Sequence, residues 1–298
     1  MSTSTTRRLE RQLGDWMRAR LPGWAAELVM FALKMGWSAI FGICLLLAII
    51  GTRAIWSDAM PVHRYDLLVV VAVGLQAAFL WLGLETWEEA RVILLFHLTG
   101  TAMEIFKVHA GSWSYPEPGL LKLYGVPLFS GFMYASVGSF MARTIRVFDM
   151  RFAPFPPFWT TLVLAVAIYV NFFSHHFLPD IRLGLFAATV LLFLRTRIWY
   201  RIGDNLYWMP LPLAAFLSAI FLWIAENIGT MTGTWVYSGQ ARLELVSLGK
   251  LGSWYLLLYV AFVTVTFVVR RPLSRQPLLR SDLATSEQRS KSPAPATG

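Results

Sequence analysis

Long apolar stretches constrain this chain more than any other feature. Several of them reach the roughly 20 residues that a helix needs to cross a bilayer. Inside lipid, a helix satisfies its own backbone hydrogen bonds, so runs of this length predict helices. With 56% hydrophobic and 14% charged residues, the chain also carries too little polar surface for a soluble protein of 298 residues. We therefore predict an all-α, polytopic integral membrane protein.

A pattern of one acid followed by two aromatic residues, Glu-x6-Gly-x-Trp-x-Tyr, occurs twice. The copies are Glu104, Gly111, Trp113, Tyr115 and, 122 residues later and without a gap, Glu226, Gly233, Trp235, Tyr237. Recurrence of a motif at a fixed offset predicts a duplicated chain whose two halves surround one shared site.

The apolar runs predict about eight transmembrane helices, arranged as two parallel four-helix repeats. Their expected ranges are 35–52, 66–84, 91–109, 124–143, 157–174, 182–200, 206–229 and 249–269. Residues 21–34 either form an interfacial lead-in helix or lengthen the first span. The predicted segments are an N-terminal segment (1–34), a first repeat (35–150), a second repeat (151–271) and a disordered cytoplasmic tail (272–298).

Basic residues gather at alternate ends of the predicted helices. The clusters are Arg7, Arg8, Arg11, Arg18 and Arg20; Arg143, Arg146 and Arg151; Arg195, Arg197 and Arg201; and Arg270, Arg271 and Arg275. The other loops hold only scattered basic residues, such as Arg53 and Arg64. The positive-inside rule then predicts a cell inner (plasma) membrane protein with both termini in the cytoplasm and both motif copies on the outer side. A net charge of +9 with this distribution indicates topology and not nucleic-acid binding.

Three polar residues share one face of the predicted third helix. His97, Thr101 and Glu104 are spaced by four and three, so they return to nearly the same angle. Lys107 follows within pairing distance of Glu104. Because such residues are costly against lipid, we expect them to face the bundle or a wet cavity. Two interpretations stay open: proton transfer or binding of a polar group, and a structural hydrogen-bonded cluster.

Glu226 and Asn227 are the counterparts in the predicted seventh helix, which lacks equivalents of His97 and Lys107. This difference predicts an asymmetric site, with one acid protonated and the other ionised. Lys250 is placed to supply a cation near Glu226 or an anionic head group, or else to extend to the interface.

The aromatic residues of the motif have two interpretations. Trp and Tyr collect at membrane interfaces whatever the function, so Trp113, Tyr115, Trp235 and Tyr237 are either anchors or the rim of a binding site. Gly111 and Gly233 are expected to cap the C-termini of their helices.

Other polar groups carry weaker signals. His175, His176 and Asp180 are expected to form a plain interfacial loop, and with one cysteine, Cys44, no thiolate metal site is possible. The sequence predicts no metal site and leaves the cofactor unknown.

Two further local features give expectations. Glu85, Glu88 and Glu89 predict a solvated cytoplasmic turn. Pro210 and Pro212 predict a kinked or broken seventh helix.

Residues 97–138 (HLTGTAMEIFKVHAGSWSYPEPGLLKLYGVPLFSGFMYASVG) resemble the YoaT-like family of uncharacterised bacterial membrane proteins. This resemblance covers most of the chain outside the two tails and implies a multi-pass membrane protein without an assigned activity. A looser similarity is to the membrane-embedded carotenoid hydratases and heterodimeric lycopene cyclases, which place a Gly-Val-Pro-Leu-like entry, here Gly125 to Leu128, after an acid and an aromatic turn. Lys107 near Glu104 departs from the cyclases and disfavours acid catalysis on a polyene.

Two functional hypotheses follow. In the first, the protein is a membrane-embedded enzyme acting on a lipid or isoprenoid, with Glu104 as general acid or base and Glu226 as a stabilising carboxylate. In the second, it is a transporter or binding protein whose acids hold a cation or carry a proton. The predicted partners are the lipid bilayer and a lipid or isoprenoid ligand.

Overall fold

The computed structural model describes residues 3–57, 59–239, 241 and 244–278, and in these ranges the chain is mostly helical. The helices are α1 (Thr3–Arg18), α2 (Gly23–Ser38), α3 (Ile40–Ile55), α4 (Arg64–Trp81), α5 (Trp87–His109), α6 (Phe129–Val147), α7 (Phe158–Ser174), α8 (Arg182–Phe193), α9 (Leu211–Met231) and α10 (Leu248–Val268). The strands are β1 (Trp113–Ser114), β2 (Lys122–Leu123), β3 (Val126–Pro127), β4 (Arg151–Ala153), β5 (Arg197–Ile202), β6 (Asn205–Pro210) and β7 (Val236–Tyr237). The predicted disordered tail lies outside the described residues from residue 279 onward.

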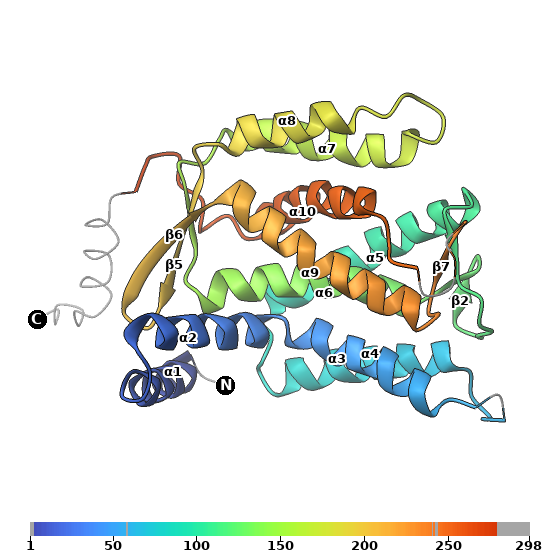
Figure 1. Cartoon of the computed structure of the whole chain (residues 1–298), viewed down its shortest axis with the longest axis horizontal. Helices are drawn as coiled ribbons and strands as arrows, with labels where there is room; N and C mark the ends of the chain where they lie inside the picture. Colours follow the sequence, from blue (N-terminus) through green and yellow to red (C-terminus); the bar gives the residue numbers. More distant parts are fainter. Residues whose placement is uncertain (1–2, 58, 240, 242–243, 279–298) are drawn as a thin grey trace, which may run out of the picture.

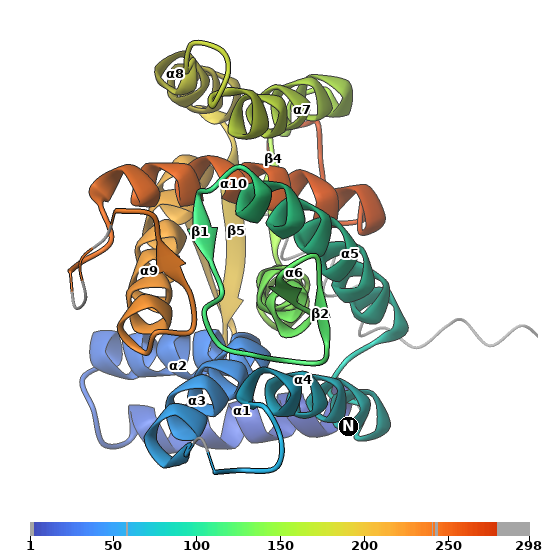
Figure 2. The same cartoon turned by 90° about the vertical axis from the view of Figure 1, so that its right-hand side faces the viewer.

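The helices form a layered bundle around α6. This helix packs against α2, α3, α4, α5 and α10, and Figure 2 shows it near the centre of the bundle in end view. The α7–α8 pair forms an outer layer over α10 (Figure 1). Short strands mark the two ends of the bundle: β1, β2, β3 and β7 lie at one end, and the β4–β5–β6 sheet at the other. We call these the β1/β7 end and the β5/β6 end.

Four of the described helices, α4, α5, α9 and α10, are long and apolar enough to cross a membrane. The α2–α3 pair passes the same test jointly but bends by 70°, which gives up to five spans if the pair counts as one. The bend at Ala39 divides the predicted first helix, 35–52, and makes the predicted lead-in a helix of its own. The apolar helices α7 and α8 are shorter, at 17 and 12 residues. A membrane protein rich in apolar helices is thus supported, on length and composition.

A β-hairpin replaces the predicted helix ends between residues 197 and 210. Strands β5 and β6 pair antiparallel, with Tyr200 opposite Tyr207. The two-residue turn begins at Gly203, whose φ of +57° suits a tight hairpin connection. The signal was present in the sequence as Gly-Asp between two runs rich in aromatic and branched residues. The predicted ranges 182–200 and 206–229 were therefore wrong at these ends.

The predicted kink in the seventh helix is also wrong. Pro210 ends β6, and Pro212 lies in the first turn of α9. The first N–H groups of a helix have no intrahelical partner, so proline there breaks no hydrogen bond. Helix α9 then continues unbroken to Met231.

Two of the three acids around the α4–α5 turn are buried, which corrects the predicted solvated turn for Glu85 and Glu89, whereas Glu88 is exposed as predicted. Glu85 and Glu89 are only 5% and 4% exposed. Glu85 Oε1 accepts hydrogen bonds from Arg143 Nη2 and Ser139 Oγ, both at 2.9 Å. Glu89 closes a capping box with Thr86 at the start of α5, and Arg146 Nε lies 2.8 Å from Glu89 Oε1. Two of the arginines predicted to mark the cytoplasmic side therefore also join α6 to the α4–α5 turn.

Candidate functional site

Glu104 is buried at 2% exposure and accepts three hydrogen bonds. Trp113 Nε1 and Tyr115 Oη donate to its Oε2 at 2.7 and 2.8 Å, and Tyr134 Oη donates to its Oε1 at 2.7 Å. The first two donors return to the acid because Gly111 reverses the chain after α5 with a φ of +69°. The spacing within the motif thus allows its Trp and Tyr side chains to hydrogen-bond to the acid of the same motif copy.

Glu226 repeats this arrangement. Trp235 Nε1 donates to its Oε1 at 2.9 Å, and the Tyr237 hydroxyl donates to the same oxygen. Trp254 Nε1 donates to Oε2 at 3.1 Å. Gly233, with a φ of +66°, makes the equivalent chain reversal after α9.

The two motif copies pair directly with each other. Strands β1 and β7 are antiparallel, with Trp113 opposite Tyr237 and Ser114 opposite Val236. The Trp113 and Tyr237 rings meet edge to face at 5.7 Å between centroids. The motif aromatics therefore point inward to the acids at the β1/β7 end and form one connected cluster.

The hydroxyl of Tyr115 remains a donor in this setting. Burial first, and then the negative charge of Glu104, hold the pKa of Tyr115 well above its ordinary value. The same two causes, with the charge of Glu226 in place of Glu104, raise the pKa of Tyr237.

Lys107 does not pair with Glu104, contrary to the prediction. Its Nζ donates to the carbonyl oxygen of Phe172 at 2.6 Å and lies 2.9 Å from His176 Nε2. The carboxylate of Glu104 is already surrounded by three aromatic donors, and the lysine points to α7 and the loop beyond it. The argument against acid catalysis on a polyene assumed a Lys107–Glu104 pair, so it no longer applies.

His97 and Thr101 lie on the same helix as Glu104 but contact α6. A Cβ atom on Gly131 would lie less than 3.0 Å from both His97 Nδ1 and Thr101 Oγ1, so the glycine permits this close packing. No hydrogen bond joins either residue to Glu104 in the described part of the chain.

Asn227 also has a separate role. Its Nδ2 donates to the Trp223 carbonyl at 2.7 Å, and its Oδ1 accepts from the Val246 N–H at 2.9 Å. It therefore fixes the segment that enters α10.

Lys250 lies over the Tyr237 ring at 3.9 Å and the Trp113 ring at 5.4 Å, which places a cation on the paired motif copies.

Tyr134 and Trp254 are site residues that the sequence interpretation missed. Tyr134 follows Glu104 by 30 residues, and Trp254 follows Glu226 by 28. Their rings lie 6.2 Å apart between centroids. Extending the repeat register beyond the motif would have found an aromatic donor at nearly the same place in both halves.

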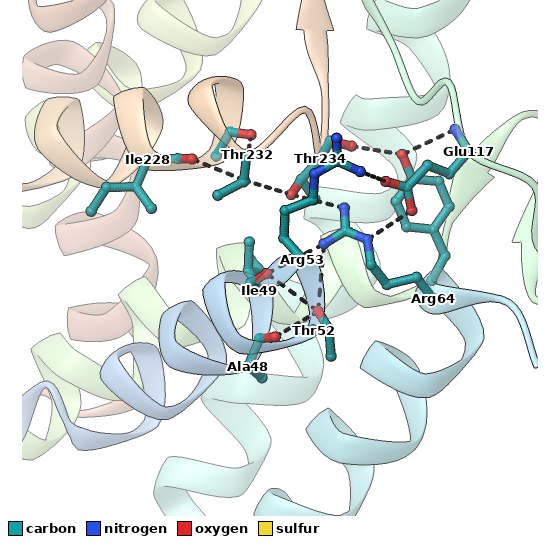
Figure 3. Close-up of polar contacts among 11 residues, drawn as sticks. Ala48, Ile49, Thr52, Arg53, Arg64, Glu117, Ile228, Thr232 and Thr234 are labelled. Atoms are coloured by element: carbon teal, nitrogen blue, oxygen red, sulfur yellow. Dashed lines mark hydrogen bonds and ion pairs between the residues drawn. The ribbon is translucent and has the colours of Figure 1, made fainter. Parts of the chain in front are cut away.

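A buried arginine joins the loops at this end of the bundle (Figure 3). Arg64, 2% exposed, lies with its Nε 2.7 Å from Glu117 Oε2, and its Nη2 donates to Thr234 Oγ1 at 3.2 Å. Tyr65 Oη donates to the Thr234 carbonyl at 2.7 Å. Arg53 Nη1 lies 3.8 Å from Glu117. Arg64 therefore links the segment after β1 to the second motif copy. The sequence had indicated only a scattered basic residue in a loop.

An apolar cavity of about 420 Å³ lies between α5, α6, α7 and α10. Its walls are built mostly from aliphatic and aromatic side chains such as Phe96, Met103 and Leu257. Tyr134 and Trp254 also line it. Each of these two residues contacts the cavity and hydrogen-bonds one of the two acids, so the acids lie directly behind the cavity wall.

The predicted outer loop between α7 and α8 makes contacts within the protein. Asp180 Oδ2 lies 2.7 Å from Arg182 Nε, and Asn171 Nδ2 donates to Asp180 Oδ1 at 3.0 Å. Among the described residues, no group of three or more His, Cys, Asp or Glu side chains is placed to hold a metal ion.

Comparison with known proteins gives a family. The model of a family described as "Protein of unknown function (DUF817)" matches residues 27–262. The chain is 43% identical over 240 residues to "Uncharacterized protein YoaT" of Bacillus subtilis (strain 168), covering 80% of this chain and 90% of that protein. No solved structure matches. The predicted YoaT-like resemblance is thus confirmed, whereas the looser similarity to carotenoid-modifying enzymes stays a prediction. This chain belongs to the DUF817 family of proteins of unknown function.

Proposed function

We propose that the protein is a membrane-embedded enzyme that acts on a lipid or isoprenoid held in the cavity between α5, α6, α7 and α10. The observation that carries this proposal is the pair of contacts at the cavity wall. Tyr134 and Trp254 face an apolar space and are hydrogen-bonded to Glu104 and Glu226. Ligand pockets are commonly apolar with a few convergent polar groups, which matches this arrangement.

The two halves of the site are suited to different tasks. A phenol can take a proton from a ligand while it passes its own proton to Glu104, to which it is already bonded at 2.7 Å. An indole N–H cannot relay protons in this way, so Trp254 only orients Glu226. Glu104 with Tyr134 is then the general base, and Glu226 is the stabilising carboxylate. The transporter alternative loses the small support that a proline kink gave it, because α9 has no such kink.

We further propose the finer architecture: eight membrane helices in two parallel repeats, 35–150 and 151–271, in the inner membrane with both termini cytoplasmic. Pairing of Ser114 with Val236, which are 122 residues apart, is the register expected around a two-fold axis that relates the repeats. Helix α1 and the last described residues both lie at the β5/β6 end, where Phe152 bridges to Leu273 (Figure 1). Reporter fusions after Trp113 and Trp235 test this, since opposite sides would contradict parallel repeats.

Replacing Tyr134 by Phe tests the enzyme proposal. The ring keeps the cavity wall intact, while the proton path to Glu104 is removed. We expect a loss of turnover of about 100-fold or more, with ligand binding retained. The measurement compares lipid extracts of cells expressing wild type and variant by mass spectrometry, together with the lipids that copurify with each protein.

Tyr169→Phe is the matched control, because Tyr169 lines the same cavity and has no hydrogen bond to either acid in the described part of the chain. We expect it to behave as wild type. Lipid profiles that are identical for wild type, Tyr134→Phe and an empty vector would overturn the enzyme proposal. Proton-coupled uptake that depends on Glu104 would establish the transporter instead.

A further inference from the structure

Lys107 supplies a buried positive charge at the β1/β7 end of the bundle. It is 2% exposed, its two described hydrogen-bond acceptors are the Phe172 carbonyl and His176 Nε2, and its Nζ also lies 3.9 Å from the centre of the Phe172 ring. No carboxylate pairs with Lys107 within the described ranges. Since an ammonium group has three donors, this lysine retains one donor for a further acceptor.

Two more cations gather at the start of α8 and α10. Lys250 lies over the Tyr237 and Trp113 rings and forms no ion pair in the described part of the chain. Arg182 reaches the same turn of α10, because a Cβ atom on the neighbouring Gly249 would lie 3.9 Å from Arg182 Nη1. Asp180 is the one carboxylate paired with this group among the residues described. Glu104 and Glu226 lie beneath the aromatic rings and are occupied by aromatic donors.

The protonation of His176 reflects this surplus of positive charge. Desolvation first, and then the charges of Lys107, His175 and Lys250, lower the pKa of His176 from its ordinary value. Since an ammonium group can only donate, His176 Nε2 is the acceptor of the bond from Lys107. We call Lys107, Arg182 and Lys250 the cationic rim.

Arg182 places one cation of the rim in a small depression beside the apolar cavity. A small depression lined by Phe172, His175, Arg182 and Leu257 lies between α7 and α10. Leu257 also lines the large cavity, so the two spaces share a wall. Lys250 precedes Leu257 by seven residues, which is about 10 Å along a helix. An amphiphile can span this separation, with its charged head group near Lys250 and the start of its apolar chain near Leu257.

We propose that the cationic rim binds the phosphate head group of an anionic lipid or isoprenyl phosphate whose apolar chain occupies the cavity between α5, α6, α7 and α10. The inference deepens the proposed function and rests on it for the position of the chain. Ammonium and guanidinium groups form strong charge-assisted bonds to phosphate oxygens. Because the three cations of the rim outnumber the one carboxylate paired with them among the described residues, N–H donors remain for the phosphate of a ligand.

The test measures lipid binding to the full-length protein in neutral detergent. The probes are a long-chain phosphatidic acid, a diacylglycerol with the same chains, and inorganic phosphate alone. The variants are Lys250→Gln and Arg182→Gln, with Arg53→Gln as the matched control. Arg53 is a partly exposed cation at the same end of the bundle, but it contacts Glu117 and does not line the cavity.

We expect wild type to bind phosphatidic acid about tenfold or more tightly than diacylglycerol. Each rim variant should remove most of that difference, and Arg53→Gln should retain it. Equal binding of the two lipids, unchanged by the rim variants, would overturn the head-group site and leave the cavity proposal standing. Binding of inorganic phosphate as tight as that of phosphatidic acid would overturn the lipid source. Absence of binding by both lipids would overturn the proposed function itself.

Discussion

Replacing Arg143 by Met is expected to lower the free energy of unfolding by about 3–5 kcal/mol. The side chains of Arg143 and Glu85 are both 0% exposed, and their charged atoms lie 2.9 Å apart. Removing the guanidinium leaves a buried carboxylate whose remaining side-chain donors, among the residues described, are Ser139 and Gln76. A buried charge without its partner is far more costly than a missing pair. The measurement is thermal or SDS-induced unfolding of the purified protein.

Two further variants separate this effect from a general sensitivity of α6. Arg146→Met is the comparison variant. The Arg146 side chain is 38% exposed in its contact with Glu89, and the buried Glu89 carboxylate keeps the Thr86 N–H as a donor, so we expect a smaller loss of about 1–2 kcal/mol. The double change Glu85→Gln with Arg143→Met removes both charges and should recover most of the stability. Equal losses in the Arg143 and Arg146 variants would show that burial of the pair is not the cause.

Gly229→Ala is expected to have the second largest effect, a loss of about 2–4 kcal/mol. A Cβ atom at this position would lie less than 3.0 Å from three carbons of the Trp235 ring. The ring must move away, and its hydrogen bond to Glu226 is lost with it. The cost therefore combines overpacking with an under-satisfied buried carboxylate.

A second glycine provides the reference for this substitution. Gly74 lies within α4, and a Cβ atom there would meet nothing within 4 Å. Gly74→Ala should leave stability unchanged or raise it by up to about 1 kcal/mol, because alanine favours the helix. If both alanine variants unfold at the same temperature as wild type, the close contact between Gly229 and Trp235 does not hold.

The motif could be predicted from the sequence because its geometry is local. Glu104 reaches Trp113 and Tyr115 within eleven residues, and one glycine with positive φ is enough to bring them together. Tyr134 and Trp254 were missed because their helices, α6 and α10, meet the acids only through tertiary packing. A single aromatic residue in an apolar helix gives no sign of which neighbour it will contact.

The contact partners of charged side chains were predicted least well, because they depend on tertiary packing. Lys107 and Glu104 are close along the helix, yet helical spacing predicts only which side chains are able to meet. The structure gives Lys107 a carbonyl and an imidazole from the segment near α7. Glu85 was expected in water because it lies in a turn, whereas an arginine 58 residues away provides its partner. Both outcomes depend on contacts that no local pattern encodes.

The pairing of β1 with β7 has a consequence for biosynthesis. Trp113 leaves the ribosome long before Tyr237. Strand β1 therefore has no partner while the more than one hundred residues between them are synthesised. Arg64 waits as well, since Thr234 becomes available only with the second motif copy. A chain that stops before α9 is therefore expected to keep an open, unpaired edge at its β1/β7 end and to be a target for membrane proteases. We therefore expect the β1/β7 end to be completed only after α9 and β7 have been made.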